Sequence, residues 1–222
     1  MRIDIVCVFP DIFSSPFSNS IIKKATNKKL VDINIHNLRD YGLGKRKKID
    51  DYPYGGGNGM VIRIEPVYQC FSMLISNRQY DEIIFMTPDG DLFSQKYAND
   101  LSLKKNIIIL CGRYKGIDQR IRDHLISKEL SIGKYILSGG ELAAAVVIES
   151  IVRLLPGVIN KTSVLTDSFQ KKSYFISPPI YTRPSIYKKW KVPNVLLSGN
   201  HKKIKKWFLK KSLQSIKKKL DF

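Results

Sequence analysis

The stretch SIGKYILSGGELAAAVVIESIVRLLPGV, residues 131–158, carries the pattern on which the fold prediction depends. It opens as a short strand pattern, breaks at Ser138-Gly139-Gly140, and continues as a long apolar helix pattern with Arg153 near its far end. Adjacent glycines let a backbone turn sharply or let a ligand come close. A strand followed directly by a helix is typical of an α/β protein.

The same alternation of Ile- and Val-rich runs with amphipathic segments extends over residues 1–159. This order predicts an α/β domain with a mostly parallel sheet. The expected strands are RIDIVCVF, VDINIHNL, EIIFMTP, NIIILCG and LSIGKYIL, and the expected helices span about 17–30, 65–75, 95–103, 118–126 and 140–155.

Three predicted strand ends carry glycine or proline, at 87–90, 111–116 and 137–140. Ligands of parallel sheets bind beyond the carboxyl ends of the strands, so we expect a pocket there. The glycine-rich loop YGGGNGM is not a P-loop, because Met60 and Val61 follow its last glycine where Lys and Ser or Thr are needed. These loops favour a nucleoside-like ligand without phosphate, such as S-adenosylmethionine.

Charge is the unusual feature of the composition. Lys and Arg number 38 against 19 Asp and Glu, which gives a formal charge of +19. Such an excess indicates a polyanionic partner, either nucleic acid or an anionic membrane surface. A solvated lysine-rich surface is the alternative.

The composition changes after Pro156. We expect a first domain over residues 1–159, a flexible polar linker over 160–175, and a small C-terminal helical domain over 176–222. The tail has an apolar stripe among lysines, which predicts a basic amphipathic helix. Because the stripe is needed for a core, a nucleic-acid face is favoured over a membrane surface.

Neither a signal peptide nor a membrane span is indicated, which predicts a soluble cytoplasmic protein. The three cysteines, Cys7, Cys70 and Cys111, lie in strand or helix patterns and are expected to be buried free thiols. They and the three histidines are widely scattered, so no metal-ligand spacing is present.

Longer motifs point to one family. In chain order YGGGNGM, MTPDG, CGRYKGID, SIGKYILSGGELA, RLLPGV, DSF, YTRP and VPNVLLSGNH resemble the bacterial tRNA (guanine-N1-)-methyltransferase family of the TrmD type. The resemblance implies the SPOUT fold, an α/β sheet with a deep trefoil knot, which is an exception to the general absence of knots. It also implies S-adenosylmethionine as methyl donor, tRNA as substrate and a homodimer.

The resemblance further implies that the knotted loops hold the donor in a bent form. Residues 132–137 and Gly112 match backbone contacts of the family, and other matching positions line its pocket. The expected donor contacts are Phe85, Met86, Thr87, Pro88, Gly112, Tyr114, Ile132, Gly133, Lys134, Tyr135, Ile136, Leu137, Gly139 and Gly140.

Two catalytic residues follow from the same resemblance. The family methylates N1 of guanosine 37 in tRNAs with guanosine at position 36. Asp167 matches its general base, although a solvated aspartate would look the same in sequence. Arg153 matches the residue that stabilises charge on the target guanine, and the alternative is an arginine complementing a helix dipole. The base is expected to act on the partner subunit's pocket and to become ordered when RNA binds.

Other matching positions are expected to contact tRNA. Ser198, Gly199, Asn200 and His201 match a motif associated with tRNA binding, although His201 alone would pass for a capping or surface residue. The loop that begins near Asp50 and includes Gly55 is expected to shape the RNA site. Packing of this loop at a dimer contact is the alternative.

One departure concerns a metal. The family usually has GRYEG where this chain has GRYKG, so Lys115 stands where a carboxylate is expected near the methionine end of the donor. The family's activity is associated with Mg²⁺, and lysine cannot ligate it. Either the ion is not needed in this protein, or Asp167 and the carboxylate of the donor suffice to hold it; no metal ligand is assigned, and Mg²⁺ is possible but doubtful because of Lys115.

Three other classes remain open. An RNA-binding protein with reduced or lost methyltransferase activity would suit Lys115 and the positive charge, although Arg153 and Asp167 argue against it. A second class is a SPOUT methyltransferase that acts on a ribose hydroxyl or on rRNA. A membrane-surface protein is the more distant third.

Overall fold

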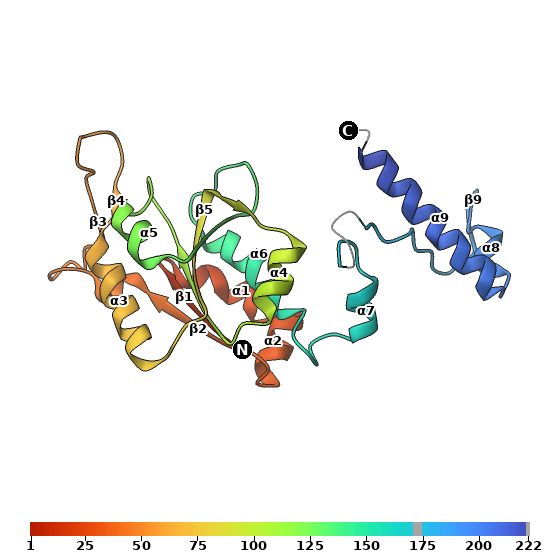
Figure 1. The fold of residues 1–222 in the computed structure, drawn as a ribbon, viewed down its shortest axis with the longest axis horizontal. Coiled ribbons are helices and arrows are strands. Elements are labelled where there is room, and N and C mark those ends of the chain that lie inside the picture. The colour runs from red at the N-terminus through yellow and green to blue at the C-terminus, as the bar shows by residue number, and fades with distance from the viewer. Residues whose placement is uncertain (171–174, 221–222) are drawn as a thin grey trace. The chain divides into compact units, whose positions relative to one another are not determined.

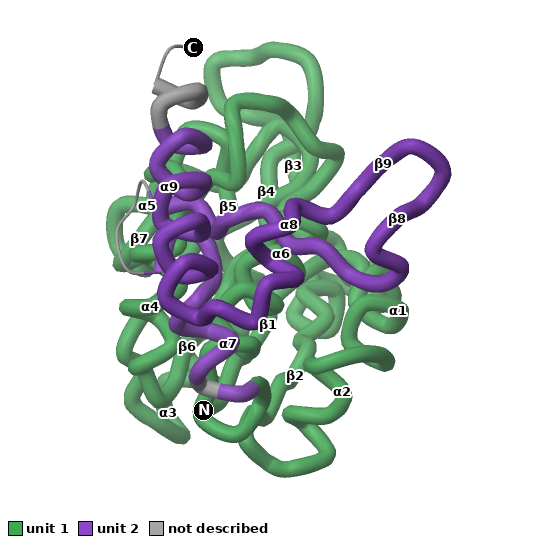
Figure 2. Tube along the Cα trace, turned by 90° about the vertical axis from the view of Figure 1, so that its right-hand side faces the viewer, with its two compact units in different colours: residues 1–159 green, residues 160–222 purple. Residues whose placement is uncertain are grey.

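The computed structural model describes residues 1–170 and 175–220. The chain forms two compact units, Met1–Ile159 and Asn160–Phe222, which Figure 2 colours green and purple. Residues 171–174, which belong to the expected linker, lie outside the described residues, as do 221–222.

The first unit is built on a parallel sheet. Its strands stand in the order β2-β1-β6-β5-β7, with every neighbouring pair parallel (Figure 1). The predicted α/β class with a parallel sheet is therefore confirmed. The strands are β1 (Arg2–Cys7), β2 (Asp32–Asn37), β5 (Glu82–Leu92), β6 (Asn106–Cys111) and β7 (Lys128–Ser131).

Helices cover both faces of this sheet. The central strand β6 explains why: Ile107 and Ile109 are buried in one core, while Ile108 and Leu110 are buried in the other. A strand buried on both faces reads as a continuous apolar run, as NIIILC does. The first core includes α2 (Ser20–Asn27), α4 (Gln95–Ser102) and α6 (Glu141–Val152), and the second includes α3 (Ile64–Asn77) and α5 (Gln119–Leu125).

Short elements complete the first unit. Two strands pair antiparallel around the glycine-rich loop 52–60, so the loop leaves and rejoins the body of the unit at one place. These strands are β3 (Asp50–Asp51) and β4 (Val61–Ile62), and the remaining elements are η1 (Pro10–Phe13), α1 (Ser14–Phe17) and η2 (Leu38–Tyr41).

Two sequence predictions need correction. The strand expected in LSIGKYIL ends at Ser131, and residues 132–139 form a loop. The hydroxyl of Ser131 donates to the carbonyl of Gly133 at 3.0 Å and accepts from its N–H at 3.2 Å, which turns the chain. TPDG was expected to end a strand, but β5 continues through it with an irregularity between Met86 and Asp91.

The second unit holds one long helix and short elements: α7 (Lys161–Thr166), β8 (Ile186–Tyr187), β9 (Trp190–Lys191), α8 (Asn194–Leu197) and α9 (His201–Leu220). Ser212 of α9 is buried and donates to the carbonyl of Ile176 at 2.5 Å. The rings of Tyr181 and Trp207 lie 6.3 Å apart. The helix is thereby held against the preceding segment. Among the described residues, no helix has the length and apolar character that crossing a membrane requires.

The three cysteines are buried and free, as predicted. Burial raises the pKa of Cys7 and of Cys70 to about 12, and burial likewise raises the pKa of Cys111 well above its ordinary value. These thiols therefore stay protonated and behave as small apolar side chains.

A buried carboxylate fixes the first strand. Asp4 is fully buried in β1, and it accepts hydrogen bonds from Arg2 at 2.7 and 2.8 Å and from Tyr80 at 2.8 Å. Nε2 of His36 lies 2.8 Å from Oδ1 of Asp4. Burial alone would raise the pKa of Asp4, but the bonds to His36, Arg2 and Tyr80 outweigh burial and lower it from 3.8 to about 2.

We expect Asp4→Asn to lower the free energy of unfolding at pH 7 by roughly 3 kcal/mol, because it removes the buried carboxylate that pairs with Arg2 and leaves Arg2 only the exposed Asp32. The folded-state pKa is lowered, so the stabilisation is present above about pH 4 and is lost as pH falls towards 2. Urea denaturation between pH 2 and 7 measures this. If the difference in free energy of unfolding between the wild type and the variant stayed constant across that range, ionised Asp4 would not be the source of the stabilisation.

Candidate active site

A cavity of about 510 Å³ lies at the carboxyl ends of β5, β6 and β7. Its walls come from the bulge of β5, the loop after β6, and the loop between β7 and α6. This is the place where parallel sheets bind ligands, and the volume is in the usual range for small-molecule sites. Every residue that the sequence suggested as a donor contact lines this cavity except Lys134.

Two of these loops touch through their backbones. Gly140 donates its N–H to the carbonyl of Gly112 at 2.8 Å, and Arg113 and Gly139 form an antiparallel bridge. A Cβ on Gly140 would lie 3.0 Å from Cα of Cys111 and from the nitrogen of Gly112. A side chain at position 140 would therefore require the neighbouring backbone to shift by a few tenths of an ångström.

Phe85 and Tyr135 give the cavity apolar walls. A Cβ on Gly112 would lie 2.8 Å from the ring of Phe85, so the absence of a side chain there leaves room for that ring. A side chain at Gly133 would collide with the ring of Tyr135. Apolar walls of this kind suit a flat heterocycle such as adenine.

Arg122 contributes charge to the wall, but its charge is already balanced. Its guanidinium donates to Glu129 at 2.7 and 2.5 Å and to Asp89 at 2.8 Å. Hydrogen bonds from Thr87 and then from Arg122 lower the pKa of Asp89. This network joins the bulge of β5 to α5 and β7.

Arg113 is engaged in a different way. The carbon at the centre of its guanidinium lies 4.1 Å from the centroid of the Phe9 ring, and its Nε lies 3.9 Å from Oε1 of Glu141. Glu141 is buried at the first turn of α6. Arg113 therefore connects the loop after β1 to the start of α6.

The glycine-rich loop reaches the same wall. Lys115 donates its N–H to the carbonyl of Met60 at 3.0 Å, and Ile62 donates to Gly116 at 3.0 Å. Burial and then the charge of Asp50 raise the pKa of Tyr114, which lines the cavity. The structure thus brings Asp50, an expected RNA contact, next to an expected donor contact.

The expected catalytic residues lie in different units. Arg153 is the half-buried C-cap of α6, where its N–H donates to the carbonyl of Glu149 at 3.1 Å. Asp167 is the C-cap of α7 in the second unit. On the far side of Asp167, Ser168 accepts from the N–H of Ser177 at 2.9 Å. The turn that carries Asp167 is therefore anchored within its own unit.

The SGNH motif begins α9. Asn200 accepts a hydrogen bond from the N–H of Lys203 at 3.0 Å, which is the geometry of an N-cap. Ser198 accepts from the N–H of Asn200 at 3.3 Å, and Gly199 has φ of +65°. His201 is exposed at the first position of the helix. The motif has a structural role that does not depend on RNA.

Sequence reasoning missed the charged wall residues. Arg113 lies inside the CGRYKG motif, which was a usable signal, but its contact with Phe9 joins residues about a hundred positions apart. The pairing of Arg122 with Asp89 and Glu129 gave no sequence signal. Within the described residues no group of three or more His, Cys, Asp or Glu side chains is arranged to hold a metal ion.

The fold and cavity define an α/β protein with a small-molecule site at the carboxyl edge of a parallel sheet. A sequence model of the family described as tRNA (Guanine-1)-methyltransferase TrmD matches residues 1–221, so the chain belongs to this family.

Proteins similar to this chain are named tRNA (guanine-N(1)-)-methyltransferase. A tRNA (guanine-N(1)-)-methyltransferase of Christiangramia forsetii is 58% identical over 219 residues, which is 98% of this chain and 96% of that protein. Proteins with this name from Bacteroides thetaiotaomicron and Porphyromonas gingivalis are 56% and 50% identical, each over 98% of this chain and 96% of theirs.

We expect Gly140→Ala to lower the free energy of unfolding by roughly 1–3 kcal/mol, because its Cβ meets backbone atoms that cannot move independently. The exposed neighbour Ser138→Ala serves as the control and should change stability by less than about 0.5 kcal/mol. Chemical denaturation compares the two variants. Equal stability would show that the loops have room to separate.

Proposed function

We propose that this protein transfers a methyl group from S-adenosylmethionine to N1 of guanosine 37 in tRNAs with guanosine at position 36. The products are 1-methylguanosine and S-adenosylhomocysteine. The observation that carries the proposal is the family match over residues 1–221. A cytoplasmic location follows from the tRNA substrate.

The cavity fits the donor. Gly112 and Gly140 line a cavity of about 510 Å³ with apolar walls, and a Cβ on either residue would press on neighbouring protein atoms. S-adenosylmethionine supplies a methyl group already activated by a sulfonium. The close contact between the loops at Gly112 and Gly140 supports the proposal that these loops form the trefoil knot of the SPOUT fold.

The chain's own residues must prepare the guanine. Neutral guanine N1 carries a proton, so a base must remove it while another group stabilises negative charge that spreads to O6. We assign Asp167 as the base and Arg153 as the stabilising cation. Among the described residues, no group of three or more His, Cys, Asp or Glu side chains is placed to hold Mg²⁺.

A second copy of the chain belongs to the proposal. Leu142 and Val146 lie one turn apart on α6 and are 55% and 48% exposed, although a helix that is apolar on all sides is normally buried. This face supports a homodimer interface. In the proposed dimer, each active site combines Asp167 of one subunit with the pocket and the Arg153 side chain of the other subunit.

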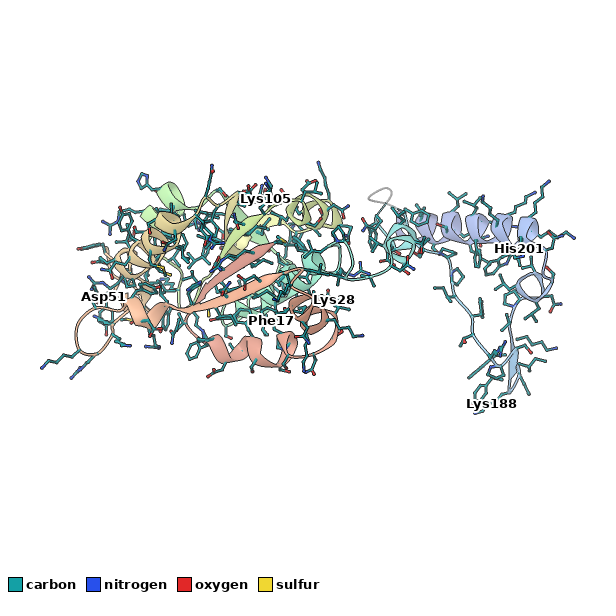
Figure 3. All side chains as sticks on the ribbon, turned by 90° about the horizontal axis from the view of Figure 1, so that it is seen from below. Phe17, Lys28, Asp51, Lys105, Lys188 and His201 are labelled. Atoms are coloured by element: carbon teal, nitrogen blue, oxygen red, sulfur yellow. The ribbon has the colours of Figure 1, made fainter. Side chains whose placement is uncertain are left out.

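The second unit has the charge that RNA requires. Residues 160–222 contain sixteen Lys and Arg and only two Asp, at 167 and 221. The β8–β9 hairpin adds exposed aromatic rings, with Tyr187 57% and Trp190 70% exposed and Lys188 at the tip shown in Figure 3. We propose that the domain over 176–222 binds tRNA and that the linker over 160–175 connects it to the first domain. Ser198–His201 and the loop of Asp50 and Gly55 are proposed to contact the tRNA as well.

The test uses labelled S-adenosylmethionine and a tRNA transcript with guanosines at 36 and 37, with and without a chelator, followed by nucleoside analysis. We expect 1-methylguanosine, and a transcript with adenosine at 37 should stay unmethylated. Methylation elsewhere would indicate another SPOUT activity. Ligand binding without any product would favour the RNA-binding alternative, which the names of the similar proteins do not support.

We expect Asp167→Asn to lower kcat by roughly 100- to 10,000-fold, which is the usual contribution of a general base. Binding of S-adenosylhomocysteine should be unchanged. Asp100→Asn removes the same charge from an exposed position on α4 and serves as the control. Single-turnover assays measure both variants. Near-normal turnover by Asp167→Asn would overturn the base assignment.

Co-expression of two inactive subunits tests whether the site is shared. If Asp167 acts in trans, a heterodimer of Arg153→Ala and Asp167→Asn has one intact site and one doubly altered site. Random pairing should then restore about a quarter of wild-type activity. Differently tagged subunits allow the heterodimer to be isolated and assayed. If both residues serve one site in cis, the heterodimer stays inactive.

A further inference from the structure

Three cationic side chains line the cavity, and two of them are engaged within the protein. Arg122 is balanced by Glu129 and Asp89. Arg113 lies over the Phe9 ring and beside the buried Glu141. Arg122 would have to break an existing ion pair to bind a ligand, whereas Nε of Arg113 is buried and has no hydrogen-bond partner among the described residues.

Lys115 is the third cation, and its situation differs. It is exposed and lines the cavity, and among the described residues no carboxylate lies within 4.0 Å of its ammonium group. Its backbone is fixed by the hydrogen bond to Met60. The position of the residue is therefore determined while its charge remains available.

The glycine-rich loop leaves a path for this side chain. A Cβ on Gly57 would lie 3.3 Å from Nζ of Lys115, and a Cβ on Gly59 would lie 3.6 Å from its Cβ. At Gly56, by contrast, a Cβ would have no neighbour within 4 Å. The ammonium group is thus held against the loop at Gly57, at the edge of the cavity.

We propose that Lys115 binds the carboxylate of the methyl donor's amino-acid tail and so selects ligands that carry this tail. The inference rests on the proposed function, because it assumes that the cavity is the donor site. The apolar walls suit the adenosyl group, and the carboxylate is the donor's anionic group. The only carboxylate of the cavity lining, Asp89, is held by Arg122 and does not compete for Lys115. An RNA phosphate is the other oxyanion that could use this cation.

Isothermal titration without RNA tests the proposal with two ligands. S-adenosylhomocysteine has the amino-acid tail, and 5′-methylthioadenosine has the same adenosyl thioether without it. We expect Lys115→Gln to weaken the affinity for S-adenosylhomocysteine roughly 3- to 10-fold, because a partly exposed ion pair contributes modestly to binding. The affinity for 5′-methylthioadenosine should be unchanged. Lys96→Gln removes an exposed charge on α4 and should change neither affinity.

Each other outcome overturns the inference. Equal weakening of both ligands would mean that Lys115 supports the cavity as a whole. Unchanged affinity for both, with a raised KM for tRNA, would assign Lys115 to an RNA phosphate. Failure of the wild-type protein to bind either ligand would overturn the proposed function itself, which separates the two failures.

A backbone variant gives a second, independent measure. Gly57→Ala and Gly56→Ala both place alanine in the left-handed region, with φ of +114° and +80°, but only the first meets Lys115. We expect Gly57→Ala to reduce the preference for S-adenosylhomocysteine over 5′-methylthioadenosine, by less than Lys115→Gln does, since a flexible side chain can move aside. Equal preference in the two alanine variants would contradict the position assigned to the ammonium group.

Discussion

The backbone contact between Gly112 and Gly140 is the constraint on which the cavity depends. Its 2.8 Å hydrogen bond joins the end of β6 to the start of α6. Neither residue can carry a side chain without displacing a neighbour, at Phe85 in one case and Cys111 in the other. Two adjacent glycines precede α6 for a steric reason: the chain must pass another loop at backbone distance.

Two arginines of the first unit, Arg113 and Arg122, line the cavity beside this contact. Arg122 ties the bulge of β5 to β7, and Arg113 ties the loop after β6 to Glu141. Both guanidiniums are largely buried and lie beside carboxylates of the protein. The proposed role of Lys115 in ligand choice therefore rests on its local position and not on the overall charge of +19.

Sequence patterns predicted the parallel α/β sheet and the buried cysteines because apolar alternation and long apolar runs report burial directly. The same reasoning extended β7 through SIGKYIL, because apolar side chains at 132, 135, 136 and 137 resemble those of a buried strand. Here they wall a cavity instead. The continuation of β5 through TPDG and the pairing of Arg122 with Asp89 were equally inaccessible, since both depend on contacts between distant segments. The roles of Arg153 and Asp167 rest on family resemblance and await the assays.

The uneven division of charge between the units bears on how one tRNA is chosen among many. A segment with sixteen cations and two aspartates attracts every polyanion of similar shape through counterion release, without reading sequence. In the proposed function, such a segment would hold any tRNA near the protein. Discrimination between the correct nucleotide and its neighbours would then follow capture and would depend on contacts other than this charge.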